Sequence, residues 1–167
     1  MTMNAAIALA RKLLNDGEAG QAHQLLAKAV SDYGLSLPAL EWQYVAHKEL
    51  NNSESGDKIL VEMARHFPWS ARPHYLRGKA EMEEGRLAEA ITSFVEADLR
   101  EPEDVTNLEA LAYCYRRLGE RTQELLVARR LVSAAPFRLV GYFFQPAPRW
   151  ILDILMKPTN VLIEARA

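Results

Sequence analysis

Hydrophobic residues recur along the chain at the three- and four-residue spacing of amphipathic α-helices, in short stretches separated by turn-forming residues. In GRLAEAITSFVEADLREP, residues 85–102, this spacing relates Ala90, Phe94 and Ala97, between a glycine and a closing proline. The turn segment NNSESGDK, residues 51–58, is expected to be the loosest. The pattern predicts helices at roughly 4–15, 19–32, 38–50, 55–66, 72–84, 87–100, 105–118 and 121–134.

The residues that separate the helices follow a common period. One series is Pro68, Pro102 and Pro136, at successive intervals of 34 residues, and the other is Gly17, Gly85 and Gly119, at intervals of 68 and 34. At the position where the glycine series lacks a member, the chain has Asn51, and asparagine is the residue after glycine that best tolerates a left-handed backbone. Two series that share one period indicate a repeat.

Residues 71–104 resemble the tetratricopeptide repeat, a helix-turn-helix unit of about 34 residues. Gly78 matches the small residue of its first helix, Gly85 its turn, and Ala90 and Phe94 its second helix. The other units depart from the pattern in places: the first has Gly34 in place of proline, the second keeps mainly the register, and the fourth has Glu124 and Ala128 where the family has alanine and a large aromatic residue. The units expected are 3–36, 37–70, 71–104 and 105–138.

Packing requirements account for these residue types. Small residues such as Ala10, Gly78 and Ala112 allow two helices to approach closely, and larger ones such as Leu26 and Phe94 fill the space between neighbours. One unit cannot bury its apolar face alone, so the units stack. The expected fold class is all-α: an α-solenoid of about four tetratricopeptide-type repeats over residues 1–138, with a hydrophobic C-terminal helical segment over residues 139–167.

The resemblance implies that the first helix of each unit lines a concave groove that binds a polypeptide. A solvated helix face is the alternative, because charges are normal there. The carboxylate clamp of chaperone-binding relatives is not reproduced, since Ile7, Trp42 and Leu76 stand where it needs asparagine and basic residues. The candidate groove residues are Arg11, Lys48, Arg72, Tyr75, Lys79, Tyr113, Arg116 and Arg117, cations that pair with carboxylates and tyrosines that offer contact area.

Motifs of catalysis are missing from the sequence. The four histidines have no paired metal-ligand spacing, and neither a glycine-rich phosphate loop nor a nucleophile elbow is present. The lone cysteine, Cys114, is expected to be a buried structural thiol. We therefore expect no enzyme activity, no cofactor and no metal site.

Composition narrows the class of partner. The chain has 167 residues, 49% hydrophobic and 25% charged, as in a soluble globular protein. A net charge of −2 argues against a whole-domain nucleic-acid surface. The sequence lacks an uninterrupted apolar stretch of the length that a membrane span needs, and Arg11 and Lys12 interrupt the N-terminal apolar part. We expect a protein or peptide partner, no nucleic acid, no membrane, and a cytoplasmic location.

The last part of the chain has a different composition. Residues 137–150 are rich in aromatics, and PRWILDILMK begins at Pro148 an apolar helix with more hydrophobic surface than a cap requires. The tail either folds over the last unit, forms an interface with another chain or a second copy, or leads into a further domain. Its candidate interface residues are Phe143, Phe144, Trp150 and Ile154.

The expected function is that of a non-catalytic protein–protein interaction module, an adaptor or chaperone that binds a polypeptide in the groove. One alternative is a homo-oligomerisation element that pairs two copies through the C-terminal segment. The other is an N-terminal regulatory domain of a larger enzyme. Reversing the charges of Arg116 and Arg117 is expected to weaken partner binding without changing helicity.

Overall fold

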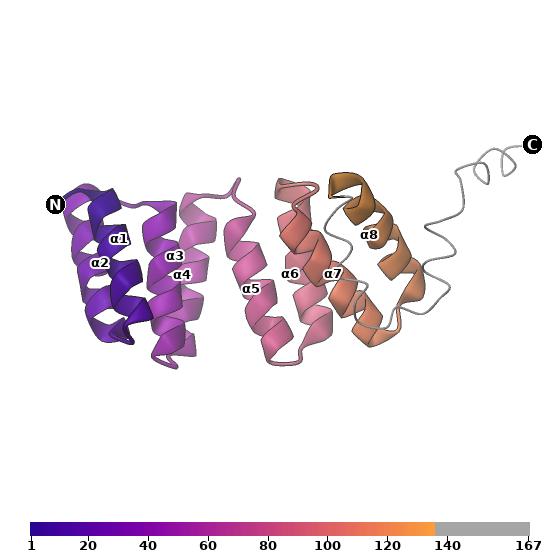
Figure 1. The fold of residues 1–167 in the computed structure, drawn as a ribbon, viewed down its shortest axis with the longest axis horizontal. Helices are drawn as coiled ribbons and strands as arrows, with labels where there is room; N and C mark the ends of the chain where they lie inside the picture. The colour runs from indigo at the N-terminus through magenta and orange to yellow at the C-terminus, as the bar shows by residue number, and fades with distance from the viewer. Residues whose placement is uncertain (136–167) are drawn as a thin grey trace, which may run out of the picture. The chain divides into compact units, whose positions relative to one another are not determined.

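The computed structural model describes residues 1–135, which are helical apart from short turns (Figure 1). The chain forms two compact units, Met1–Pro102 and Glu103–Ala167, the second described as far as residue 135. Unit 1 contains α1 to α6 and unit 2 contains α7 and α8. The helices are α1 Met3–Asn15, α2 Ala19–Tyr33, α3 Leu37–Glu49, α4 Ser53–His66, α5 Arg72–Glu83, α6 Leu87–Arg100, α7 Val105–Leu118 and α8 Arg121–Ala134.

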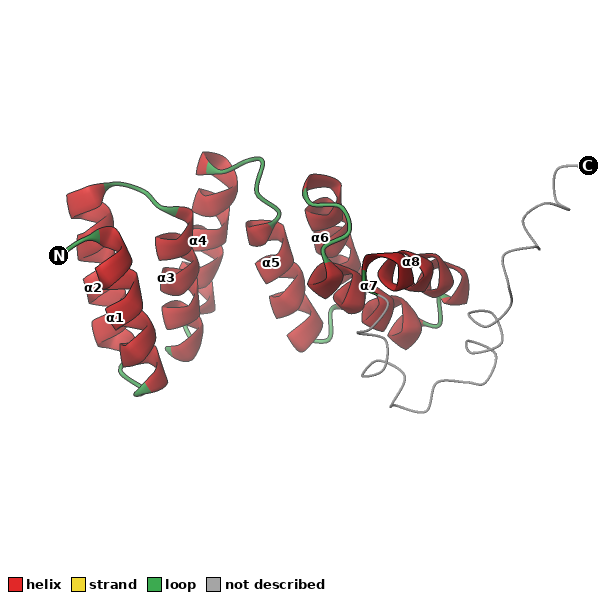
Figure 2. Cartoon of the chain, turned by 45° about the horizontal axis from the view of Figure 1, so that its top comes forward, coloured by secondary structure: helices red, strands yellow, loops and turns green. Residues whose placement is uncertain are grey.

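The sequence pattern predicted these helices well. Every observed boundary lies within two residues of the expected one, and the described residues contain no strand (Figure 2). The expected fold class, helical pairs of the tetratricopeptide type, is therefore confirmed for residues 1–135. Pro136 and the C-terminal segment lie outside the described residues.

Side chains and prolines start several of the helices. The side chains of Thr2, Asn52 and Asp104 accept hydrogen bonds from the backbone N–H three residues later, at 3.3, 3.1 and 2.8 Å. These bonds satisfy N–H groups that have no partner within the helix. Pro38 and Pro73 occupy the first turns of α3 and α5, where a missing N–H costs nothing.

The four turns inside the helical pairs share one geometry. Asn51 has a positive φ of 52°, like the glycines of the other three turns, at 78–80°. The expectation that residues 51–58 form the loosest turn is wrong, because α4 already begins at Ser53 behind its Asn52 cap. Equivalent backbone hydrogen bonds close the turns, from Glu18 to Leu13, Asn52 to His47, Arg86 to Glu81 and Glu120 to Tyr115, at 2.8–2.9 Å.

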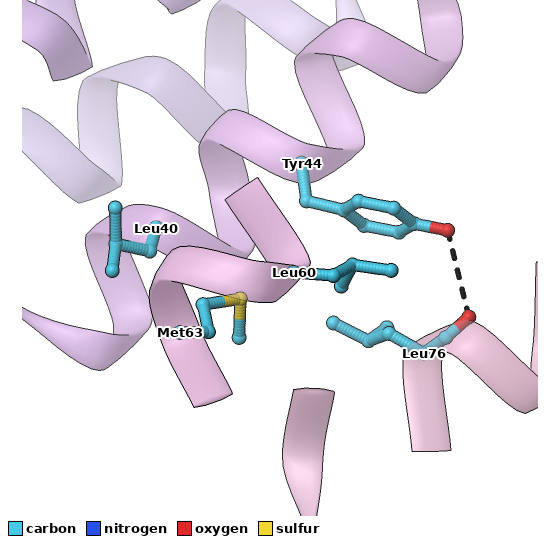
Figure 3. Packing of buried hydrophobic residues seen from close by; sticks show 5 residues of the cluster. All are labelled: Leu40, Tyr44, Leu60, Met63 and Leu76. Atoms are coloured by element: carbon cyan, nitrogen blue, oxygen red, sulfur yellow. Dashed lines mark hydrogen bonds between the residues drawn. The ribbon is translucent and has the colours of Figure 1, made fainter. Parts of the chain in front are cut away.

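The core of unit 1 follows the stacking of its three helical pairs. Around the first pair and α3, Ala10, Ala22, Leu26 and Ala39 are buried together, and Trp42 packs against them. A second cluster joins α3, α4 and α5 (Figure 3). There the Tyr44 hydroxyl donates a hydrogen bond of 3.5 Å to the Leu76 carbonyl. The members of this second cluster are Leu40, Tyr44, Leu60, Met63 and Leu76.

The third pair, α5 and α6, is joined by a close steric contact. Phe94 is fully buried, and its ring lies directly over Gly78. A Cβ at Gly78 would lie 2.8 Å from two ring carbons, so no larger residue fits without movement. The prediction that Gly78 and Phe94 pack in the core is confirmed.

Unit 2 packs α7 against α8 by a different contact. Its apolar core includes Leu108, Leu111, Ala112 and Leu131. Between these helices Arg116 Nε donates a hydrogen bond of 2.7 Å to Glu124, whose side chain is only 5% exposed. Glu124, which departs from the repeat pattern, is thus part of an ion pair.

Candidate protein-interaction surface

The candidate groove residues all lie on first helices of the pairs, α1, α3, α5 and α7, as the resemblance implied. Tyr75 and Arg116 are half-buried and the others are exposed. In unit 1 the exposed members are Arg11 on α1, Lys48 on α3, and Arg72 and Lys79 on α5. Exposure leaves these side chains available for contact, while their pairing within the chain differs from residue to residue.

Two of the cations join neighbouring pairs in unit 1. Lys48 on α3 forms a hydrogen-bonded ion pair with Glu83 on α5, and Arg72 on α5 forms one with Glu41 on α3. The two bridges connect these first helices near both ends. Because the cations are exposed, each bridge stabilises the fold little, and a charged ligand can exchange with it at low cost.

Cations and aromatic rings contact one another on first helices in both units. The Arg11 guanidinium lies 5.2 Å from the Trp42 ring centroid, so this contact connects α1 and α3. Arg72 lies 5.4 Å from the centroid of Tyr75 on the same helix. In unit 2, Arg117 lies 5.7 Å from the centroid of Tyr113 and donates to its hydroxyl at 2.8 Å. The distances are those of cation–π attraction.

The two remaining cations differ from the others and from each other. Arg116 is engaged by Glu124, so its side chain helps to join α7 to α8. Reversing its charge would therefore disturb the packing of unit 2, which makes the expected Arg116 and Arg117 double reversal a poor test of binding. Lys79 is exposed on α5, and none of the described residues forms an ion pair or hydrogen bond with it.

The sequence did not reveal the partners of these cations. Glu41 and Glu83 lie on the first helices α3 and α5, but their pairing with Arg72 and Lys48 is a tertiary feature. In the sequence, Trp42 only marks a departure from the carboxylate clamp, whereas in the structure Arg11 lies over its ring. The paired residues are separated by 31 and 35 residues, close to the repeat period, so each bridge joins adjacent repeats.

A cavity of about 820 Å³ opens in unit 1 between the second and third pairs. Its charged lining is mixed: Lys48 pairs with Glu83, and Arg86 pairs with Glu84. Burial, followed by the nearby carboxylates, raises the pKa of Tyr44 in its wall. Because carboxylates and cations neutralise one another there, charge does not select a ligand for this cavity.

Two further titratable sites involve buried side chains. Cys114 is buried as predicted, and desolvation raises the pKa of its thiol to about 11. His23 on α2 and His47 on α3 are in ring contact, with centroids 4.4 Å apart, which the sequence spacing did not suggest. Among residues 1–135, no group of three or more metal-binding side chains comes together.

Two predictions remain, the interface residues of the C-terminal segment and the expectation that no segment spans a membrane. The candidate interface residues Phe143, Phe144, Trp150 and Ile154 lie outside the described residues. Within residues 1–135, none of the helices has the length and apolar character needed to cross a bilayer.

No family model matches the chain. A sequence relative and several solved structures do resemble it, and the solved structures support the fold. A relative named Hsp70-Hsp90 organizing protein, from Triticum aestivum, is 28% identical over 129 residues, which are 74% of this chain and 22% of that protein. The chain thus spans about a fifth of the length of this relative.

Several solved structures that resemble this chain carry the name MamA. One, with a TM-score of 0.67 and 14% identity, covers 82% of this chain and 80% of its own. Another, with a TM-score of 0.64 and 15% identity, covers 80% of this chain and 73% of its own. At these identities the likeness concerns the fold, which is a tetratricopeptide-like arrangement of helices.

Proposed function

We propose that this chain is a non-catalytic protein–protein interaction module that binds a polypeptide along the first helices of its pairs. The observation that carries the proposal is the recurrence of cation–aromatic contacts on these helices in both units. We call the unit 1 set, Arg11, Trp42, Arg72, Tyr75 and Lys79, the first-helix face.

The chemistry of this face suits a polypeptide ligand. Arginine, tyrosine and tryptophan are the residues most often responsible for binding energy at protein interfaces. Stacking holds the guanidinium groups of Arg11 and Arg72 near one orientation, so less conformational entropy is lost when a partner binds. The donors of both groups suit carboxylates or backbone carbonyls of a partner.

The sequence relative supports a role in protein interaction, since its name describes a protein that organises two others. Its own partners are not transferred here, because the match covers only 22% of its length. The positions of the carboxylate clamp also differ, with Ile7, Trp42 and Leu76 in this chain. We therefore propose a partner other than a chaperone tail.

The test compares two charge reversals in the full chain. Lys79→Glu changes the first-helix face, and Lys28→Glu makes the same charge change at an exposed position of α2, a second helix. A partner is first identified by pull-down and mass spectrometry from the native host. Its affinity is then measured for both variants by titration calorimetry.

We expect Lys79→Glu to weaken binding by about fivefold, because one favourable charge contact becomes a repulsive one. Lys28→Glu should leave the affinity unchanged, and both variants should keep the helical circular dichroism of the parent. Equal affinities for the parent and Lys79→Glu would contradict binding on this face.

The proposal also includes the location of the protein and the pairing of two copies. We predict that the protein is located in the cytoplasm. Pairing of two copies through residues 139–167 is the alternative function, and light scattering on the full chain and on residues 1–138 distinguishes it. A dimer that becomes a monomer on truncation would favour the alternative, whereas a monomer in both cases would exclude it.

A further inference from the structure

A pair of histidines lies where the first and second helical pairs of unit 1 meet. His23 is on α2 and His47 on α3, and their rings are tilted by 54° with centroids 4.4 Å apart. His47 is 9% exposed. The same junction contains the buried alanines of α1, α2 and α3 and the Arg11–Trp42 contact. The junction therefore contains both the histidine pair and part of the first-helix face, the Arg11–Trp42 contact.

Neither ring has a polar partner at one of its nitrogens. The Nδ1 atoms of both histidines are buried without a hydrogen bond among the described residues. A neutral imidazole tolerates this at one nitrogen, but an imidazolium carries two N–H donors, and a buried donor without an acceptor is costly. A proton added to either Nδ1 atom would thus create a buried donor that has no acceptor among the described residues.

Among the described residues of unit 1, no carboxylate offsets a positive charge on His47. The helices that pack against α3 in unit 1 include α1, α2 and α4, and the charge that acts on His47 from them is that of His23. The charged neighbours of His47 on α3 itself are Lys48 and Glu49, both exposed, and Lys48 is paired with Glu83. Desolvation first, and His23 second, lower the pKa of His47.

We propose that the His23–His47 pair is a pH-sensitive junction that loosens the contact between the first two helical pairs when the solution becomes acidic. Two positive charges 4.4 Å apart repel one another, and protonation leaves buried donors unsatisfied. The first-helix face includes Arg11 and Trp42 across this junction, so acid also weakens partner binding. This last step rests on the proposed function.

The direction of the effect follows from proton binding. The folded state binds a proton at His47 less readily than the unfolded state, whose histidine has a pKa near 6.5. Stability from this site is therefore fully present above about pH 6.5 and decreases as the pH falls below it.

Hydrogen exchange on the full chain tests the junction without any ligand. Amide exchange is measured by mass spectrometry at pH 7.5 and 5.5, after correction for the intrinsic pH dependence of exchange. We expect a several-fold increase in exchange at pH 5.5 in residues 19–49, with α8 as an internal reference, because residues 103–135 contain no histidine. Single variants His47→Gln and His23→Gln, which cannot become charged, should lose this increase.

The control is His66→Gln, which removes an exposed histidine of the same unit, at the end of α4. It should keep the increase shown by the parent. The inference is overturned if both His47→Gln and His23→Gln respond to pH as the parent does. Because His23 is only half-buried, its variant tests the pair even if His47→Gln fails to fold.

A second measurement concerns the partner. Once identified, it should bind the parent about fivefold more weakly at pH 5.5 than at 7.5, the low end of ordinary coupling between sites. His23→Gln should reduce this loss. If exchange responds as expected but no variant of the first-helix face changes the affinity, the proposed function fails and the junction stands. If the face binds but exchange is unchanged in the histidine variants, the junction alone fails.

Discussion

The third and fourth helical pairs join their two helices at equivalent positions by opposite chemistry. Moving one repeat along the chain takes Gly78 to Ala112, Met82 to Arg116, Ala90 to Glu124 and Phe94 to Ala128. The third pair places a buried phenyl ring on a glycine. The fourth has alanine in place of that ring and instead places an ion pair, Arg116 to Glu124, between α7 and α8.

The difference shows that equivalent positions of two repeats can join their helices by an apolar contact or by an ion pair. The apolar contact is sensitive to shape, because cores are tightly packed. The ion pair is sensitive to the loss of either partner, because the remaining side chain loses a hydrogen bond of 2.7 Å and the opposite charge beside it.

Phe94→Ala is expected to have the largest effect, a loss of about 3–5 kcal/mol in the free energy of unfolding, because it empties the centre of the third pair. Urea denaturation followed by circular dichroism measures the loss. Hydrogen exchange should locate it in α5 and α6. A loss below about 1 kcal/mol would mean that the ring is not the main contact of this pair.

Glu124→Ala should cost about 2 kcal/mol. It removes the Glu124 carboxylate that pairs with Arg116, and the 30% exposure of the Arg116 side chain lets water take over part of the role of that carboxylate. The double variant Arg116→Met with Glu124→Ala installs the residues of the third pair and should recover most of the loss. Urea denaturation of the three proteins gives the comparison. If the double variant is no more stable than Glu124→Ala, the charge of Arg116 is not the cause.

Gly78→Ala should destabilise the third pair by about 1–2 kcal/mol, because the new Cβ overlaps the Phe94 ring. Gly56→Ala is the matched control on α4: it is also buried, but there the Cβ would lie at an ordinary 3.5 Å from Tyr44. That variant should be neutral or gain up to about 1 kcal/mol from helix propensity. Thermal melts of both variants measure the difference, and equal melting temperatures would contradict the steric reading.

The alkylation rate of the Cys114 thiol measures how tightly the fourth pair is packed, and we expect the smallest effect here. Burial raises its thiol pKa to about 11, so the thiolate fraction is negligible at pH 8 and grows only as the pH approaches that value. Alkylation by iodoacetamide should be slow in the folded parent at pH 8 and faster in Glu124→Ala. Mass spectrometry follows the reaction, and fast alkylation of the parent would show that the thiol is accessible.

The sequence predicted most of the fold because a fixed repeat period restricts where helices begin and end. Asn51 illustrates this: its place in the glycine series anticipated a left-handed turn, which the structure has. The error concerned the following residues, where a polar stretch suggested a loose loop although Asn52 caps α4. Capping depends on one side chain, which composition over a window does not distinguish.

The sequence predicted the helices on which the candidate residues lie, but not the partners of those residues within the chain. Register placed the cations on first helices, and that is where they lie. Register could not show that Arg116 is engaged by Glu124, or that Lys48 and Arg72 pair with carboxylates of a neighbouring repeat. These contacts depend on how two helices are set against each other, and a sequence separation alone does not give that.

By itself, then, the sequence determined the number and limits of the helices in residues 1–135, the positions of their turns and the small residues at their contacts. These depend on local preferences and on a period that the chain repeats. The tertiary structure alone decided that Glu124 pairs with Arg116, that Arg11 contacts Trp42 and that His23 contacts His47. Those pairs lie on different helices, and side chains from different helices meet only after the backbone has packed.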